Sequence, residues 1–312
     1  MDTVAVLGAG LMGHALALIH ALGDKPVALQ DTSPKALAKA PGLIEAALAT
    51  LVEAGETTAA EAKAAIGRIR CTPSLEDAVR GADLIVEAVV EDPGVKREVF
   101  AGLDRVAKPA ALIASNTSYL DVFPLSPPSR ARTTLVAHWY TPPYIVDLVD
   151  LVGSDRTDPA AIETLRALYA GWGKKPVVLK RFIPGYVANR IQAAITNEVF
   201  RLIDEGYATP QDVDDAVIHG LSLRMPLLGH IKKADFTGLE LVQRALANKT
   251  WEPAPVTGRS TTVDRLMAEG RTGVMVGKGF FDYSGRTPDD LFRERDRRLL
   301  SLKRHLRELG DI

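Results

Sequence analysis

Short apolar runs alternate with longer helix-forming segments through the first half of the chain. Strands buried on both faces read as continuous apolar runs, and parallel strands are joined by helices. Segments 14–22, 35–66 and 95–106 are expected to be helical, with breaks in the second at Pro41-Gly42 and Gly55. The pattern predicts an α/β fold with a Rossmann-type doubly wound sheet. The expected strands are residues 4–7, 27–31, 83–90, 110–115, 133–138 and 148–152.

The pattern changes after about residue 180, where strand signals largely vanish. A long helical stretch is expected over residues 184–205, and further helices over 211–219, 239–247 and 291–309, the last of them charged and amphipathic. The second half is therefore expected to be a mostly helical domain. We predict a sheet-containing domain over residues 1–182 and a helical domain over residues 183–312.

Composition narrows the class of protein. The chain has 312 residues, a formal net charge of −1, 46% hydrophobic residues and 25% charged residues. The balanced charge gives no basic footprint for nucleic acid, and no apolar stretch approaches the roughly 20 residues that span a bilayer. The start of the chain leaves no room for a signal peptide, and Cys71 as the single cysteine excludes an intramolecular disulfide and a multi-cysteine zinc site. We expect a cytoplasmic protein without nucleic acid, membrane or metal partners.

A glycine-rich turn follows the first expected strand and opens the first expected helix. Residues 8–13 read Gly-Ala-Gly-Leu-Met-Gly, the G-x-G-x-x-G pattern. In this pattern Gly8 permits the tight turn, Gly10 lets backbone approach a pyrophosphate, and Gly13 lets the helix pack close to the strand. The helix N-terminus adds free N–H groups and a partial positive charge. The turn, with Leu11 and Met12, predicts a dinucleotide site.

Asp31 ends the second expected strand, where a carboxylate accepts hydrogen bonds from an adenosine ribose diol. A carboxylate at this place repels a 2′-phosphate, and Thr32 beside it offers no cation in compensation. We therefore expect NAD rather than NADP as the cofactor. The alternative is a helix-opening turn with an unrelated surface aspartate.

Polar residues also follow later strands. Residues 115–118 read Ser-Asn-Thr-Ser just past a buried run, at the sheet edge where ligands bind, or they form a capped turn. His138 ends one apolar run and Asp150 lies in the next, at equal distances from Tyr144. If the two runs pair as antiparallel strands, the two side chains face one another. A carboxylate fixes the tautomer of an imidazole that acts as a general base; the alternative is a core histidine with an unrelated aspartate.

Other polar residues have weaker signals. Asn189 lies early in the expected 184–205 helix, where its amide either reaches the active site or bridges helices. His14 and His20 lie in the helix after the glycine turn and are expected at the surface or at an interface.

Taken together, these segments resemble the 3-hydroxyacyl-CoA dehydrogenase family. The motifs occur in one order and at family-like spacing nearly from end to end of the chain. The resemblance implies an N-terminal Rossmann domain, a C-terminal helical domain that dimerises, and an active site in the cleft between them. The matching segments are residues 8–13, 86–91 with Lys96, 115–118, the segment from His138, 184–190 and 277–283.

The resemblance also implies roles for single residues. His138 is the general base that takes the hydroxyl proton as hydride passes to the nicotinamide, and Asp150 stands where the family has an orienting glutamate. Ser118 hydrogen-bonds the reacting hydroxyl, and Asn189 helps to bind the substrate carbonyl. The remaining matches, at cofactor-contacting positions, are Glu91, Lys96 and Asn116.

The chain departs from the family pattern at places that bear on the substrate. Thr141 replaces an asparagine, and Asp150 is one methylene shorter than glutamate. Arg224, in Leu221-Ser222-Leu223-Arg224, looks more like short relatives that act on free hydroxy acids, such as L-gulonate 3-dehydrogenase (lambda-crystallin) and carnitine dehydrogenase. An arginine binds a carboxylate with two parallel hydrogen bonds, whereas a thioester offers no such partner; the alternative for Arg224 is an ion pair.

We therefore expect an NAD-dependent dehydrogenase that interconverts a 3-hydroxyacyl substrate, as a CoA thioester or a related form, and its 3-keto form. The alternatives are a dehydrogenase of a small free 3-hydroxy acid and a non-catalytic NAD-binding protein. A β-hydroxyacid dehydrogenase of the lysine-catalysed kind is disfavoured, because Asn189-Arg190 stands where that family needs a lysine. The resemblance implies a homodimer with a role in fatty acid metabolism.

Overall fold

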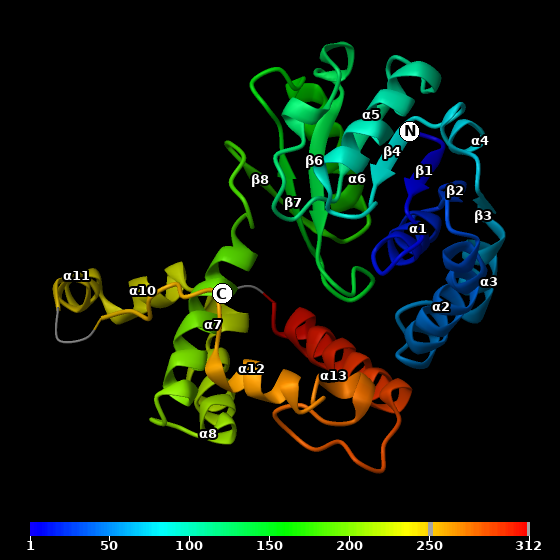
Figure 1. The fold of residues 1–312 in the computed structure, drawn as a ribbon. Coiled ribbons are helices and arrows are strands. Elements are labelled where there is room, and N and C mark those ends of the chain that lie inside the picture. The colour runs from blue at the N-terminus through cyan, green and yellow to red at the C-terminus, as the bar shows by residue number, and fades with distance from the viewer. Residues whose placement is uncertain (249–251, 311–312) are drawn as a thin grey trace. The chain divides into compact units, whose positions relative to one another are not determined.

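The computed structural model describes residues 1–248 and 252–310. The chain divides into two compact units, Met1–Tyr186 and Val187–Ile312. In Figure 1 the first unit runs from blue to green, and the described residues of the second unit run from green to red. The division falls a few residues beyond the expected position between 182 and 183, after the segment that follows the last strand.

The first unit is built on one eight-stranded sheet with the order β3-β2-β1-β4-β5-β6-β7-β8. Strands β1 to β6 are parallel, β6 pairs antiparallel with β7, and β7 pairs parallel with β8. The Rossmann-type doubly wound sheet is therefore confirmed. The strands are β1 Val4–Leu7, β2 Val27–Gln30, β3 Ile69–Thr72, β4 Leu84–Glu87, β5 Leu112–Ser115, β6 Thr134–Trp139, β7 Leu148–Val152 and β8 Lys175–Leu179.

The two strands that the apolar pattern did not predict are β3 and β8, which lie at the two edges of the sheet. In β3 only Thr72 is buried, and β8 has no buried residue. An edge strand has a neighbour on one side only, so its sequence need not form a continuous apolar run. The sequences of these two strands therefore lack the continuous apolar run that predicts a strand.

Helices connect the strands of the first unit. Helix α2 runs straight through Pro41-Gly42, where we expected a break, because both residues are exposed while Ala40, Ile44 and Leu48 keep a continuous buried stripe. The expected break at Gly55 is present, since α2 ends at Glu53 and α3 begins at Ala59. The helices are α1 Gly13–Leu22, α2 Pro34–Glu53, α3 Ala59–Gly67, α4 Leu75–Val79, α5 Pro93–Val106 and α6 Pro159–Gly171, with short 3-10 turns η1 Phe123–Leu125 and η2 Pro128–Arg130.

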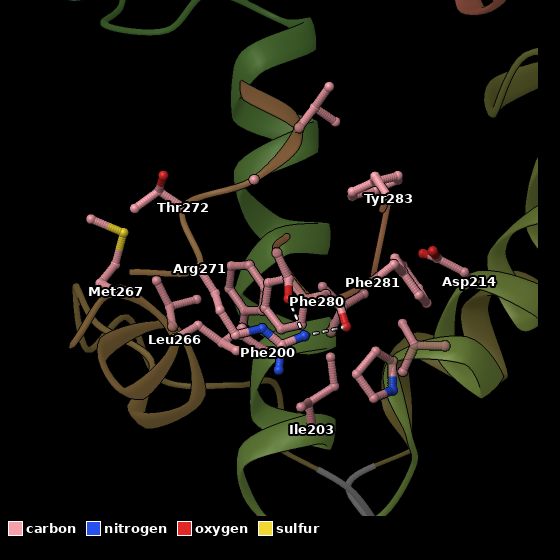
Figure 2. A pocket seen from close by; sticks show the side chains of 17 residues that line it. Phe200, Ile203, Asp214, Leu266, Met267, Arg271, Thr272, Phe280, Phe281 and Tyr283 are labelled. Atoms are coloured by element: carbon pink, nitrogen blue, oxygen red, sulfur yellow. Dashed lines mark hydrogen bonds between the residues drawn. The ribbon is translucent and has the colours of Figure 1, made fainter. Parts of the chain in front are cut away.

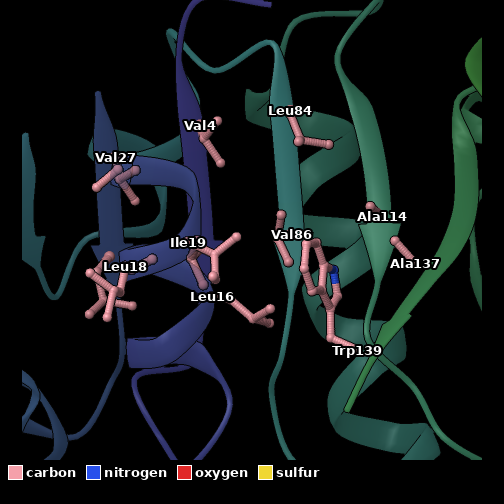
Figure 3. Packing of buried hydrophobic residues seen from close by; sticks show 14 of the residues in the cluster. Val4, Leu16, Leu18, Ile19, Val27, Leu84, Val86, Ala114, Ala137 and Trp139 are labelled. Carbon is pink, nitrogen blue, oxygen red and sulfur yellow. The ribbon is translucent and has the colours of Figure 1, made fainter. Parts of the chain in front are cut away.

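Both faces of the sheet are covered by apolar side chains. Val4 and Val6 of β1 pack in one core cluster with Leu16 of α1, whereas Ala5 and Leu7 pack in the other cluster. Figure 3 shows the first cluster, in which residues of α1 lie against the strands. Because successive strand residues point to opposite faces, burial of both faces requires an unbroken apolar run. The apolar runs in the sequence therefore predict the positions of the inner strands.

The expectation that His14 and His20 lie at the surface or at an interface is wrong, because α1 packs inside the first unit against α2, α3 and the sheet. Both histidines are buried. The Nδ1 atom of His14 lies 2.7 Å from the Gly10 carbonyl oxygen, and that of His20 lies 2.7 Å from the Leu16 carbonyl oxygen. The His20 ring packs among Trp139, Tyr169 and Trp172.

The burial of His20 predicts a pH-dependent stability. Burial lowers the pKa of His20 from 6.5 to about 4, so the unfolded chain binds the proton more readily than the folded chain. The contribution of neutral His20 to the free energy of unfolding is present above pH 6.5 and is lost as the pH falls towards 4. Between pH 7 and pH 5 we expect the wild-type protein to lose about 2 kcal/mol of unfolding free energy that His20→Leu does not lose.

Urea unfolding of the two proteins at both pH values measures this difference. His230→Leu, which changes an exposed histidine, serves as the matched control. It is expected to lose as much unfolding free energy between pH 7 and pH 5 as the wild type. An equal loss in wild type and His20→Leu would show that other groups cause the pH dependence.

The second unit is helical, as predicted. Its first long helix, α7, begins at Ala188 and not at Pro184, because Gly185 and Tyr186 adopt φ values of 79° and 50°. That left-handed backbone cannot continue a right-handed helix. The elements are α7 Ala188–Asp204, α8 Pro210–Asp215, the π-helical turn η3 Ala216–Ser222, α9 Met225–Leu228, α10 Ile231–Thr237, α11 Leu239–Ala247, α12 Thr261–Ala268, the 3-10 turn η4 Val274–Val276 and α13 Pro288–Leu309. Within the described ranges, no helix combines the length and apolar character of a membrane span.

Candidate active site

The glycine turn joins β1 to α1 at the carboxyl edge of the sheet. A Cβ atom on Gly8, whose φ is +92°, would lie 2.5 Å from the Ala88 carbonyl oxygen. A Cβ atom on Gly13 would lie only 1.6 Å from the Gly8 carbonyl oxygen, whereas one on Gly10 would meet nothing within 4 Å. Gly8 and Gly13 are therefore required by backbone packing, and Gly10 leaves open space beside the turn.

A cavity of about 720 Å³ lies at this edge. Asp31 stands on its wall and accepts hydrogen bonds from the Ala9 and Ser33 backbone N–H groups, both at 2.7 Å. No lysine or arginine is among the residues that line the cavity. The predicted residues that line it are Gly8, Gly10, Leu11, Met12, Asp31, Glu91, Asn116 and Ser118, whereas Gly13 and Lys96 lie outside its lining.

Lys96 is buried in an ionic cluster with Glu87 and Glu91, of which Glu91 lines the cavity. Its ammonium contacts both carboxylate oxygens of Glu87, at 2.7 and 2.9 Å, and lies 3.2 Å from Glu91. Ser115 at the end of β5 donates a third hydrogen bond to Glu87 at 2.5 Å. Lys96 is 1% exposed and Glu87 is 0% exposed, so each charge depends on the other for its compensation.

Glu91 holds the turn that carries Ser118. One of its oxygens accepts hydrogen bonds from the Thr117 hydroxyl at 2.7 Å, the Ser118 N–H at 2.8 Å and the Tyr119 N–H at 3.0 Å. Partial burial opposes ionisation, but these hydrogen bonds and the nearby Lys96 charge outweigh it and lower the pKa of Glu91. The turn is therefore held by a charged acceptor at neutral pH.

Asn116 connects this turn to the next strand. Its side-chain oxygen accepts a hydrogen bond from the Trp139 N–H at 2.8 Å, and its own N–H donates to the Glu87 carbonyl oxygen at 2.7 Å. Asn116, directly after β5, therefore bonds to the end of β4 through its backbone N–H and to β6 through its side-chain oxygen, while it lines the cavity.

His138 and Asp150 face each other across β6 and β7, so the predicted antiparallel pairing is confirmed. The Nδ1 atom of His138 lies 3.3 Å from Asp150 Oδ2, and its Nε2 atom lies 3.1 Å from Ser118 Oγ. The side chains of His138 and Asp150 are both buried. The other oxygen of Asp150, Oδ1, is buried without a hydrogen-bond partner among the described residues.

Two tyrosines that sequence reasoning missed enclose the imidazole. The Tyr140 ring lies edge-on to His138 at 4.6 Å, and the Tyr186 ring lies 4.8 Å away on a tilted plane. The Tyr140 hydroxyl donates to Asp150 Oδ2 at 2.6 Å, and the Tyr186 hydroxyl donates to the Thr117 carbonyl oxygen at 2.7 Å. Burial, then the charges of Glu91 and Asp150, raise the pKa of Tyr186, which keeps its proton.

The signal for Tyr140 was its position two residues beyond His138, which places both on one side of an extended chain. Tyr186 had no comparable signal, because the pattern predicted that it lies within a regular helix. Its backbone is left-handed, with a φ of 50°, and its ring lies 4.8 Å from the His138 ring.

Three further residues were predicted on the substrate side, one in the first unit and two in the second. Thr141 donates to the Met12 sulfur at 3.2 Å, which connects it to the glycine turn. Asn189 is half-buried in the first turn of α7, and Arg224 is exposed and donates to the Gly220 carbonyl oxygen at 2.9 Å. Asn189 and Arg224 belong to the second unit, and their roles stay predictions.

Comparison with family models assigns both units. The model of the 3-hydroxyacyl-CoA dehydrogenase NAD-binding domain matches residues 3–182, and the model of the family's C-terminal domain matches residues 185–283. The chain belongs to the 3-hydroxyacyl-CoA dehydrogenase family. It is an NAD-dependent oxidoreductase of the 3-hydroxyacyl-CoA dehydrogenase type, acting on a CH–OH group.

Relatives in this family differ in their substrates. The chain is 29% identical over 311 residues to 5-formyl-3-hydroxy-2-methylpyridine 4-carboxylate 5-dehydrogenase of Mesorhizobium japonicum, with 97% of each chain covered. It is 32% identical over 287 residues to 3-hydroxybutyryl-CoA dehydrogenase of Mycobacterium tuberculosis, with 91% of this chain and 99% of the relative covered. A crystal structure of a 5-formyl-3-hydroxy-2-methylpyridine 4-carboxylic acid 5-dehydrogenase, an NAD+-dependent dismutase, matches with a TM-score of 0.85, 26% identity and full coverage of both chains.

The residues present at the cavity fit the family's cofactor. The open space beside Gly10 leaves backbone accessible to a pyrophosphate, and Asp31 keeps lone pairs for a ribose diol. When bound, NAD supplies the hydride acceptor. Among residues 1–248 and 252–310, no group of three or more His, Cys, Asp or Glu side chains is arranged to hold a metal ion.

Proposed function

We propose that this family member interconverts a secondary alcohol β to a carbonyl group and the corresponding ketone, with His138 as the general base. The observation that carries the proposal is the hydrogen-bonded series Ser118–His138–Asp150 at the edge of the cofactor cavity. A buried, oriented imidazole beside a hydroxyl is the arrangement that removal of an alcohol proton requires.

The chain's own residues define the proton path. An ionised Asp150 only accepts hydrogen bonds, so the contact with Nδ1 places the imidazole proton on that nitrogen. The Nε2 lone pair then faces Ser118, whose hydroxyl marks where a substrate hydroxyl is held. When Nε2 takes the proton, Asp150 stabilises the resulting imidazolium.

For the substrate, we propose a 3-hydroxyacyl group, as a CoA thioester or a related form, bound with the help of Asn189 and Thr141. The family membership and the likeness to 3-hydroxybutyryl-CoA dehydrogenase of M. tuberculosis support this choice. A small free 3-hydroxy acid is the alternative. In that case Arg224, whose guanidinium is exposed, binds the substrate carboxylate.

A second candidate reaction is the oxidation of an aldehyde on an aromatic carboxylic acid. The full-length match to the pyridine-carboxylate dehydrogenase structure, at a TM-score of 0.85, favours it. In this reaction the same base removes a proton from the hydrated aldehyde, so the geometry around His138 serves both reactions. The substrate carboxylate again gives Arg224 a partner.

Substrate panels distinguish these reactions. NADH oxidation is measured with acetoacetyl-CoA and with free 3-keto acids, NAD reduction is measured with aromatic aldehyde acids, and each assay is repeated with Arg224→Ala. High acetoacetyl-CoA activity that Arg224→Ala leaves unchanged supports the thioester substrate. Activity restricted to free acids and lost in Arg224→Ala supports a carboxylate substrate, and no turnover on any member contradicts the proposed function.

The cofactor preference gives a separate prediction. Asp31→Ala is expected to raise the Kd of NAD by about tenfold, because the ribose diol loses its carboxylate partner. It should weaken NADP binding far less, since the same change removes the repulsion of the 2′-phosphate. Fluorescence titration with both nucleotides measures the ratio. An unchanged NAD-to-NADP preference would contradict the role of Asp31.

We also propose that the enzyme is a cytoplasmic homodimer, joined through residues 187–312, with a role in fatty acid metabolism. Among the described residues of this unit, the buried hydrophobic side chains are only Val213, Leu266 and Leu300. An apolar cavity of about 360 Å³ opens within the unit (Figure 2). Large apolar side chains that are exposed in this unit include Leu246, Ile231, Phe236 and Leu239.

Large apolar side chains that gather at an exposed surface mark a protein interaction site, and here we propose a subunit interface. Light scattering after size-exclusion chromatography tests the proposal, with a mass near twice 33.6 kDa as the expected result. Phe236→Glu should convert the dimer to a monomer, and a monomeric wild-type protein would contradict the proposal.

A further inference from the structure

One oxygen of Asp150 receives two hydrogen-bond donors. The Tyr140 hydroxyl lies 2.6 Å from Oδ2, whereas His138 Nδ1 lies 3.3 Å from the same atom. The phenol therefore makes the shorter contact, and the second oxygen, Oδ1, has no partner among the described residues. The charge of this buried carboxylate is divided between the phenol and the imidazole.

Other groups around His138 do not duplicate this contact. Ser118, on the turn after β5, faces Nε2, and Tyr186 covers the ring while its hydroxyl bonds to the Thr117 carbonyl oxygen. The further charged groups near this cluster are Glu91 on the loop after β4 and Asp121 after the Ser118 turn, which act on the Tyr186 hydroxyl together with Asp150. Asp150 is the only one of these acids with a hydrogen bond to the imidazole among the described residues.

We propose that Tyr140 is a positioning residue that weakens the action of Asp150 on His138 by taking part of its charge in a hydrogen bond. This inference rests on the proposed function of His138 as the base. A donor that remains on Oδ2 lowers the carboxylate's attraction for an added imidazolium charge. The phenol also fixes the rotamer of a side chain one methylene shorter than glutamate.

Tyr140→Phe removes the hydroxyl and keeps the ring against His138. The carboxylate then acts on the imidazole alone, so the imidazolium is more stable and the neutral base persists only at higher pH. For alcohol oxidation, we expect the acid limb of kcat/KM to move up by roughly 0.5 to 1 pH unit, which lowers kcat/KM about threefold to tenfold on that limb.

Tyr186→Phe is the matched control, because it makes the same change in a second ring against the same imidazole. Its hydroxyl donates to the Thr117 carbonyl oxygen, and the change leaves the Tyr140–Asp150 hydrogen bond in place, so the midpoint of the acid limb is expected to stay at the wild-type pH. A limb that moves down or stays in place in Tyr140→Phe, or that moves equally in both variants, overturns the inference.

An Asp150→Asn background tests whether Tyr140 acts through the carboxylate. In that background the change from tyrosine to phenylalanine is expected to leave the midpoint in place, because no carboxylate charge remains to be divided. A shift as large as in the wild type overturns the inference. Failure of the proposed function looks different: His138→Gln then keeps its activity, and no variant's acid limb reports on the imidazole.

Discussion

Replacement of His138 by glutamine is expected to lower kcat by a factor of about 10² to 10⁴. A glutamine side chain keeps a polar group of similar size on β6, but it cannot take a proton near neutral pH. General acid–base catalysis by a positioned side chain contributes a factor of this order. His138 does not line the cofactor cavity, so NAD should bind as tightly as in the wild type.

Steady-state kinetics on the best substrate of the panel and a fluorescence titration with NAD measure the two effects. Asp150→Asn is the companion variant. Its amide cannot supply the negative charge that stabilises an imidazolium, and kcat should fall more than NAD affinity. If His138→Gln lost NAD binding and cooperative unfolding as well, the residue would be structural, and the base would have to be sought elsewhere.

Gly13→Ala is expected to cause the largest loss of stability among small changes at the site. The added Cβ would lie 1.6 Å from the Gly8 carbonyl oxygen, so the turn and α1 must separate. Overpacking of this kind costs about 3 kcal/mol or more, which corresponds to a fall in Tm of roughly 10 °C for a domain of this size. The displaced turn should also lose NAD.

Gly10→Ala is the matched control, because its Cβ meets nothing within 4 Å. It should fold with a wild-type Tm and still raise the Kd of NAD by about tenfold, since the methyl group occupies the space beside the turn that a pyrophosphate needs. Differential scanning fluorimetry with and without NAD measures both properties. Equal thermal shifts for the two variants would contradict the separate roles assigned to the glycines.

The inner strands and the His138–Asp150 pair could be predicted from the sequence because both depend on local periodicity. A strand covered on both faces needs an unbroken apolar run, and two antiparallel strands around a central bend bring equidistant residues together. The edge strands β3 and β8 were not predicted, because an edge strand needs no unbroken apolar run. The burial of His20 was not predicted, because a helix on a sheet is expected to have one exposed face and α1 has almost none.

Sequence motifs also do not predict which neighbours a buried side chain contacts, as Lys96 shows. The family motif predicts that Lys96 contacts the cofactor, and this stays a prediction; its ammonium contacts Glu87 and Glu91 and is not among the groups that line the cavity. Tyr140 and Tyr186 were missed because aromatic residues in apolar segments are usually core. Only the directions of their hydroxyl groups, which no pattern encodes, separate them from ordinary packing.

The left-handed turn at Gly185 and Tyr186 has a consequence for dividing the chain. Tyr186 is the last residue of the first unit and covers one side of the His138 imidazole. A fragment cut at residue 182, where the family's domain model ends, would lack the ring that covers that side of the imidazole. Any recombination that exchanges C-terminal units between relatives therefore has to carry its crossover past this tyrosine, or the transplanted partner must bring an aromatic residue of its own.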